Sequence, residues 1–119
     1  MATPNIVSVA TINAVNAAAA ITTSRAAAID VAADKVAKVN TILVCNIDGT
    51  NSATVTIEVS IDNGSNFVAI GSTIAVPADA TLSFLENPIY LDETDLLYFT
   101  ASANSDLTYF VSYETLDDA

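Results

Sequence analysis

The sequence predicts an all-β fold: an antiparallel β-sandwich, jelly-roll-like or immunoglobulin-like, that follows an Ala-rich N-terminal arm. From about residue 26 onward, short stretches of alternating apolar and polar residues succeed one another, and this alternation is the pattern of half-buried strands. Turn residues separate the stretches at a spacing of roughly ten residues, which is typical of sandwiches. The chain has 119 residues, of which 52% are hydrophobic, so one domain can bury a full core.

Residues 1–25 form the predicted N-terminal arm, and residues 26–119 form the single β-sandwich domain. Alanine favours helix, whereas the segments NIVSV and AITTS are rich in β-branched residues, which favour strands. We expect an extended arm that packs on a neighbouring chain, because small and nearly uncharged side chains suit close packing. No basic segment precedes an apolar run at the N-terminus, so no signal peptide is expected.

The first strands of the domain are expected at AAAIDV and, after a turn at AADK, over residues 36–47. The second of these is apolar on both faces, with one face predicted to carry Val39, Leu43, Cys45 and Ile47 and the other Ile42 and Val44. A strand that is apolar on both faces is covered on both sides. We therefore expect it to be central in a sheet, or to have its outer face covered by another subunit.

The stretch ATVTIEVSI gives the clearest alternation in the chain. Its residues on the predicted core face are Val55, Ile57, Val59 and Ile61. The pair Asn63-Gly64 predicts a hairpin, because both residues tolerate the positive φ that tight hairpin turns require. Pro77 is expected to end the returning strand, since proline cannot donate a hydrogen bond to a ladder.

Four further strands are expected at ATLSFL, IYL, LLYFTASA and LTYFVSYETL. In the last one the residues predicted to share a face are Leu107, Tyr109, Val111 and Tyr113. Strands that are apolar on both faces suit self-association, since obligate interfaces are more apolar than ordinary surfaces. The candidate interface residues are therefore Ile42, Val44, Leu97, Phe99 and Phe110.

No catalytic residue and no cofactor site is predicted. The chain contains no histidine and a single cysteine, Cys45, so the usual general base, the nucleophile–base pair and a zinc site are all missing. Phosphate-binding, dinucleotide-binding and nucleophile-elbow motifs are absent as well. The acids fall mostly in turns, where carboxylates are solvated or bond their own backbone. We expect that the protein is not an enzyme.

A metal site is not predicted, although the segment DETD offers the candidates Asp92, Glu93 and Asp95. Loop carboxylates are the oxygen ligands that Ca²⁺ prefers. The favoured interpretation is a polar connection that leads a buried strand back into the sheet. Asp48 and Asp62 are interpreted as solvated turn residues, because neither of their segments meets the EF-hand pattern.

The net charge of −11, from 14 acids and three basic residues, excludes two classes of partner. Nucleic-acid binding needs Lys and Arg to release counterions from phosphates, and anionic membranes also attract basic segments. The simplest role of the charge is solubility, because copies of an apolar chain repel one another.

Five segments follow one another in an order that carries a resemblance: VAADKVAKVNTILVCNIDG, ATVTIEVSIDNGSNFVAI, STIAVPADATLSFL, PIYLDETDLLYFTAS and LTYFVSYETL. In this order they resemble small β-rich virion proteins of tailed bacteriophages, over roughly residues 26–116. Those families share a hairpin with DG or NG, a V-P-A segment before a strand, and a closing S-Y-x-E strand. DETD stands where an x-x-G-D turn is expected.

The resemblance implies a multi-copy structural protein of the virion, assembled in the host cytoplasm. Its role would be capsid decoration or cement, or a part of the neck or tail. The implied partners are other copies of the chain and virion proteins such as the major capsid protein or neck and tail proteins. The alternative is a receptor- or glycan-binding sandwich, with or without calcium bound at DETD, in which tyrosines stack on a sugar.

Overall fold

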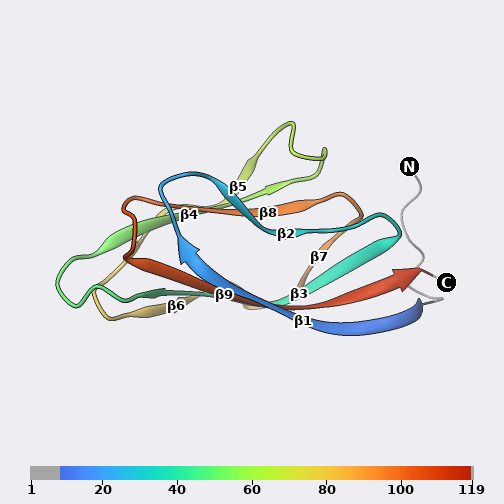
Figure 1. Cartoon of the computed structure of the whole chain (residues 1–119), viewed down its shortest axis with the longest axis horizontal. Coiled ribbons are helices and arrows are strands. Elements are labelled where there is room, and N and C mark those ends of the chain that lie inside the picture. The colour runs from blue at the N-terminus through green and yellow to red at the C-terminus, as the bar shows by residue number, and fades with distance from the viewer. Residues whose placement is uncertain (1–8, 119) are drawn as a thin grey trace.

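The computed structural model describes residues 9–118, which form nine β-strands in two packed sheets (Figure 1). The strands are β1 (Val9–Ile21), β2 (Ala26–Asp30), β3 (Lys35–Asn46), β4 (Ala53–Ser60), β5 (Val68–Val76), β6 (Thr81–Ser83), β7 (Ile89–Leu91), β8 (Leu96–Ala101) and β9 (Leu107–Asp118). The predicted antiparallel β-sandwich is confirmed. No helix that could cross a membrane occurs among the described residues.

The order of the strands identifies the sandwich as a jelly roll. Sheet A has the order β1-β9-β3-β6, with β7 also on β3, and sheet B has the order β2-β8-β4-β5. The first strand therefore pairs with the last, the second with the next to last, and so on inward to the β4–β5 hairpin. This nested pairing, rolled into two sheets, is a jelly roll, and the immunoglobulin-like alternative has a different strand order.

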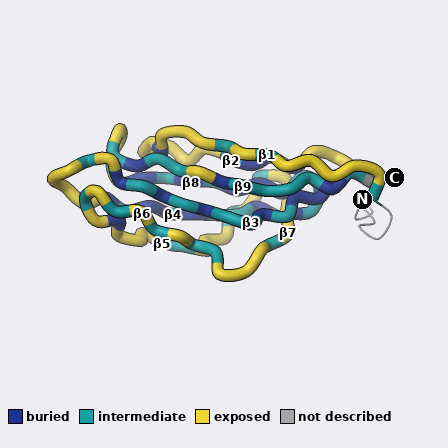
Figure 2. The backbone as a smooth tube through the Cα atoms, turned by 90° about the horizontal axis from the view of Figure 1, so that it is seen from below, coloured by how far each residue is buried: buried dark blue, intermediate teal, exposed yellow. Residues whose placement is uncertain are grey.

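The core lies between the two sheets, and the middle strands carry most of it. Figure 2 shows buried backbone concentrated on β3, β4, β8 and β9, with exposed segments at the loops and along both sides. The ring of Phe99 on β8 stacks on that of Tyr109 on β9, with centroids 4.6 Å apart. The expected inward face of β9 is confirmed, since Leu107 and Val111 are buried on the side that carries Tyr109.

β3 is central in sheet A as expected, but the predicted assignment of its faces is wrong for its second half. The register of β3 against β9 shifts between Val39 and Thr41. Because side chains alternate with a period of two, one extra residue moves every following side chain to the opposite face. Ile42 and Val44 are therefore buried in the core, whereas Leu43 and Cys45 lie on the outer face.

The predicted turns lie where the sequence places them, with one difference in length. Asp48 follows β3, and Asn63 and Gly64 adopt the expected positive φ between β4 and β5. The connection between these strands spans residues 61–67 and is no two-residue turn, so Ile61 belongs to the loop and is 75% exposed. Its prediction as a core residue is wrong. Pro77 directly follows β5, as expected.

The N-terminal arm is extended from Val9 onward. Its strand β1 pairs antiparallel with β9 of the same chain, from Val9 opposite Asp118 to Ile21 opposite Leu107. Residues 1–8 of the predicted arm lie outside the described residues. The packing of the arm on a neighbouring chain stays a prediction, and the pairing with β9 leaves the other edge of β1 available for it.

Candidate functional site

Four of the five interface candidates lie in the core of their own chain. Ile42, Val44, Leu97 and Phe99 are buried between the sheets, so they are core residues and cannot reach a partner. The reason is that both strands are covered within one chain: β3 lies between β9 and the strands β6 and β7, and β8 lies between β2 and β4. Phe110 alone of the five is exposed, at 39%.

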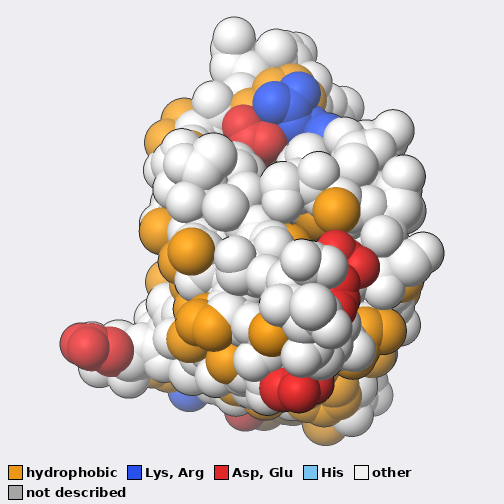
Figure 3. Space-filling model, turned by 90° about the vertical axis from the view of Figure 1, so that its left-hand side faces the viewer, with side chains coloured by type: hydrophobic (Ala, Val, Ile, Leu, Met, Phe, Trp, Pro, Cys, Tyr) orange, Lys and Arg blue, Asp and Glu red, His pale blue; other side chains and the backbone are white. Residues whose placement is uncertain are grey.

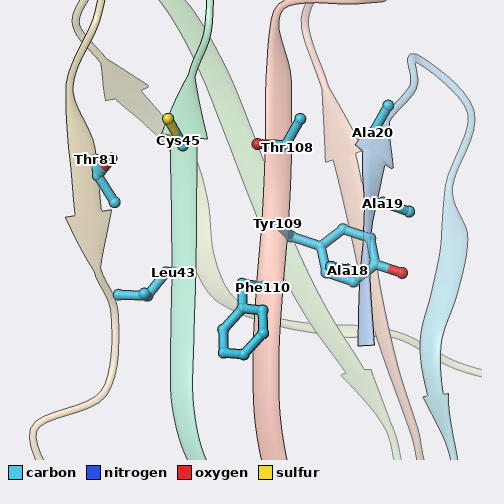
Figure 4. A pocket seen from close by; sticks show the side chains of 9 residues that line it. All are labelled: Ala18, Ala19, Ala20, Leu43, Cys45, Thr81, Thr108, Tyr109 and Phe110. Carbon is cyan, nitrogen blue, oxygen red and sulfur yellow. The ribbon is translucent and has the colours of Figure 1, made fainter. Parts of the chain in front are cut away.

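Phe110 marks a shallow apolar groove on the outer face of sheet A. Leu43 lies opposite Phe110 across β3 and β9, and Ala18 of β1 lies opposite it on the other side. Cys45 and Thr108 continue the groove, whose volume is about 460 Å³. Figure 4 shows these residues on four neighbouring strands, from β6 to β1. The groove therefore ends on the first strand of the chain.

The segment DETD forms the corner between β7 and β8, and its carboxylates bind backbone amides. The Glu93 carboxylate accepts a 2.8 Å hydrogen bond from the Asp34 N–H, and the Asp95 carboxylate accepts one from the Asp92 N–H at 2.9 Å. The Thr94 N–H donates to the Val31 carbonyl at 2.8 Å. These bonds join two corners at which the chain passes between sheets A and B.

Burial of this corner affects its acids. Desolvation raises the pKa of Asp95 above its ordinary value, although the hydrogen bond from Asp92 opposes that shift. Glu93 is 7% exposed, and its Oε1 atom has no hydrogen-bond partner. Among residues 9–118 no group of three or more His, Cys, Asp or Glu side chains is arranged to hold a metal ion. The hydrogen bonds of DETD give this segment a structural role at the corner between β7 and β8.

The tyrosines do not form an exposed row over the described residues. The rings of Tyr98 and Phe67 meet edge to face, with centroids 5.0 Å apart, and Arg25 lies 3.8 Å from the centroid of Phe67. The Arg25 guanidinium also donates to both carboxylate oxygens of Glu58, at 2.8 and 3.1 Å. Tyr90 is the large exposed aromatic ring apart from Phe110. A sugar-stacking platform would need several such rings together.

Acidic side chains are distributed unevenly over the strands. The fourteen acids begin at Asp30, and none lies between residues 63 and 78. β1 and β5 are therefore free of charge, and both are edge strands. At the end of the molecule seen in Figure 3, acidic groups are scattered among apolar and uncharged ones and form no continuous patch.

The four sheet edges differ in how they are protected against pairing with another chain. Short strands, charges, proline and bulges are the usual protective devices. β6 and β7 have three residues each and are separated by a connection that contains Glu86 and Pro88. β2 has five residues, directly follows Arg25 and ends in Asp30. β5 is longer, but its register against β4 shifts twice.

β1 is the edge that carries none of these devices over most of its length. It has thirteen residues, VATINAVNAAAAI, without a charge or a proline. Its register against β9 is regular from Thr11 to Ile21. Most of its side chains are exposed, and Ile12 is exposed to 62%. We call the unpaired side of β1 the β1 edge.

The side of the sandwich beneath the β1 edge is also incompletely closed. A second cavity of about 250 Å³ opens between β1 and β2. It is lined by Ala19 and Ala20 of β1, by Ala27 of β2, and by the stacked core rings of Phe99 and Tyr109. Core aromatic surface thus reaches the outside on the same side as the β1 edge.

The expected packing of the N-terminal arm on a neighbouring chain agrees with the β1 edge, whereas the five named interface candidates all lie on other strands. The sequence does contain a signal for this edge. In a chain with net charge −11, residues 9–21 contain no charged side chain. That signal becomes an exposed edge only through the strand order, because β1 lies at the end of sheet A.

Comparisons with known proteins give a fold and no family. No protein-family model matches the chain, and no curated protein matches it. A solved structure of Bacillus endospore appendages, described as a family of disulfide-linked pili, covers 92% of this chain and 88% of its own, with 14% identity and a TM-score of 0.53.

Two other structures have TM-scores below 0.5, and we draw nothing from them. One is the Drosophila NLP core, studied for pentamer formation and histone binding, with 15% identity, 87% coverage of this chain, 96% coverage of its own and a TM-score of 0.47. The other is a pentameric capsid protein from metagenomic phage sequences, with 12% identity, 86% coverage of this chain, 60% coverage of its own and a TM-score of 0.40. At 14% identity, the endospore-appendage structure shows that this chain has a fold already known in another protein.

Proposed function

We propose that this chain is a non-enzymatic, multi-copy structural protein of a tailed-bacteriophage particle, where it decorates or stabilises the capsid or forms part of the neck or tail. The β1 edge carries the proposal. A strand of thirteen uncharged residues with an unpaired side is a ready template for another chain. In a protein that stays monomeric, the unpaired side of β1 would have no partner strand.

Two further observations support the proposal. The ordered sequence segments between residues 26 and 116 resemble virion proteins of tailed phages. The endospore-appendage structure, which has a similar fold, belongs to pili, and pili are assemblies of many copies. The first observation favours a phage particle, and the second favours a repeated structural unit.

Mass in solution tests whether the protein forms multi-copy assemblies. We expect light scattering after gel filtration to detect oligomers, and more of them at 1 M than at 0.01 M NaCl. The reason is that each copy carries a net charge of −11, and the screening length falls from about 30 Å to about 3 Å between these salt concentrations. A monomer at all protein and salt concentrations would contradict the proposal.

Location tests the assignment to a phage particle. An antibody raised against the purified chain should label intact tailed particles produced by the strain that carries the gene. Absence of the chain from purified particles, together with a melting temperature that rises on addition of a glycan or Ca²⁺, would favour the receptor-binding alternative instead, because a ligand that binds only the folded state stabilises it.

A further inference from the structure

We propose that two copies of this chain associate through their β1 edges, antiparallel about a two-fold axis, so that sheet A continues from one subunit into the other. This inference rests on the proposed multi-copy role and adds the surface and the geometry. The pairing is isologous, with the same strand contributed by both subunits.

The backbone of β1 supplies the driving force. Along an edge strand, every second residue directs its N–H and C=O groups away from the sheet. β1 presents such groups over a regular register from Thr11 to Ile21. A second strand satisfies these groups by extending the ladder. β1 has thirteen residues, which exceeds the usual length of a strand in globular proteins.

Charge selects the occupant. A partner that brings acids to this position would be repelled by Glu114 of β9, the strand next to β1, whereas Asp117 is paired with Lys35. The β1 edge of a second copy brings no charge at all. β2, β6 and β7 are short and have charged residues beside them, so a second β1 is the long and uncharged strand that fits.

Uncovered apolar surface lies on the same side. Ile12 is exposed on β1, and the cavity between β1 and β2 reaches the core rings of Phe99 and Tyr109. In a two-fold pair the second subunit lies over this side, because its own β1 continues sheet A. The groove that ends at Ala18 would also continue across the axis.

β5, the other long uncharged edge, is the main competitor as a partner for β1. Figure 2 shows β1 and β5 on opposite sides of the sandwich. Pairing between them would be head to tail and would form rings or filaments. The register of β5 shifts opposite Val55/Ile57 and Ile57/Glu58 of β4, and such shifts bend a strand away from a regular ladder, so the two-fold β1 pair is favoured.

Cross-linking distinguishes these geometries. In a Cys45→Ala background, which removes the natural thiol, Asn16→Cys places one thiol on β1 and Ser72→Cys one on β5; both positions are exposed. A flexible bismaleimide should convert Asn16→Cys alone into covalent dimers, and Ser72→Cys alone should stay uncross-linked. Mixing differently tagged forms of the two variants should give no mixed product.

Two outcomes would overturn the inference. One is a mixed product between Asn16→Cys and Ser72→Cys without dimers of Asn16→Cys alone, which indicates head-to-tail pairing. The other is an oligomer by light scattering in which neither thiol cross-links. In both cases the multi-copy role stands, whereas a monomer at all protein and salt concentrations contradicts the proposed function itself.

A charge on the edge gives an independent measurement. Asn16→Asp places two like charges beside each other near the axis, and we expect the dimer dissociation constant to rise at least tenfold. Ser83→Asp is the matched control, because Ser83 is an exposed residue on the edge strand β6. Equal dissociation constants for the two variants, at unchanged melting temperature of the monomer, would exclude β1 from the interface.

Discussion

β1 and β5 are the two long uncharged edge strands, and they are held in place by different means. β1 is fixed by a long regular ladder to β9. β5 has a less regular ladder to β4 and is anchored by side chains from other elements. Asp62 organises the loop before it, the Thr56 hydroxyl accepts a 3.1 Å hydrogen bond from Thr73 N–H at its centre, and Asn46 binds the Val76 carbonyl at its end.

The difference shows that two long edges without charge can differ in the regularity of their backbone. Thr73 has a φ of 45°, and this kink coincides with the irregular register of β5. Bulges and kinks spoil the regular spacing that a foreign strand needs. β5 is therefore uncharged but has an irregular backbone, whereas β1 is uncharged and regular. The side-chain contacts that hold β5 can be removed one at a time by mutation.

The largest effect is expected from Asn46→Leu. Asn46 is buried, its amide donates to the carbonyls of Asn51 at 3.0 Å and Val76 at 2.9 Å, and its Oδ1 accepts from the Asp48 N–H. Leucine has a similar volume but leaves these buried groups unpaired, so we expect a loss of about 2–4 kcal/mol in the free energy of unfolding.

Urea unfolding measures this loss, and Asn87→Leu in the connection between β6 and β7 is the control because Asn87 is exposed. Hydrogen exchange should show faster exchange of the β5 amides in Asn46→Leu and unchanged exchange in β1. Equal unfolding free energies for the two variants would contradict the anchoring role of Asn46.

A smaller effect is expected on acidification. Hydrogen bonds from the Asn66 side chain, the Asn66 N–H and the Ser60 hydroxyl lower the pKa of Asp62 below its ordinary value of 3.8. A carboxylate whose pKa is lowered by folding stabilises the fold above the unfolded pKa, and this contribution is lost as the pH falls through the folded pKa. The pKa of Asp48 is also lowered, by hydrogen bonds from Thr50 and Asn51.

Melting temperatures between pH 6 and pH 3 check this expectation. Asp62→Asn should be less stable than the natural chain at pH 6, and its melting temperature should fall less on acidification. Asp30→Asn removes the same charge at an exposed site and serves as control.

Asp95 acts in the opposite direction: its raised pKa gives stability at low pH that is lost as the pH rises from 3.8 to the folded pKa.

The smallest effect is expected from Thr56→Val. The change keeps a β-branched side chain on β4 but removes the acceptor of the Thr73 N–H, so we expect a loss of about 0.5–1.5 kcal/mol. Thr54→Val, on the same face of β4, is the matched control. If calorimetry gives the same unfolding free energy for both, the kink in β5 does not depend on Thr56.

Features that are encoded locally could be predicted from the sequence. Alternation places Val55 and Ile57 in the core, and Pro77 follows the end of β5. The positive φ of Asn63 and Gly64 follows from the tolerance of these residue types. In each case the cause lies within a few residues of the effect.

Features that depend on distant segments could not be predicted. The register shift after Val39 is a property of the pairing between β3 and β9, and it reversed the expected faces of Leu43 and Val44. The strand order, which decides between a jelly roll and an immunoglobulin-like sandwich, is not written in alternation. The β1 edge depends on the same order, so the nearly uncharged arm could be expected to pack on another chain but not to form the edge strand of a sheet.

The nested pairing has a consequence for synthesis of the chain. Among the nine described strands β1 leaves the ribosome before all others, and its partner β9 leaves after them. The β4–β5 hairpin needs only a local loop, so pulse-labelling hydrogen exchange should find its amides protected before those of β1. Contacts between distant residues form slowly, and strands that stay unpaired meanwhile can join the wrong chain. Nascent copies on one messenger RNA therefore expose β1 without its partner strand for most of translation, when neighbouring copies are closest.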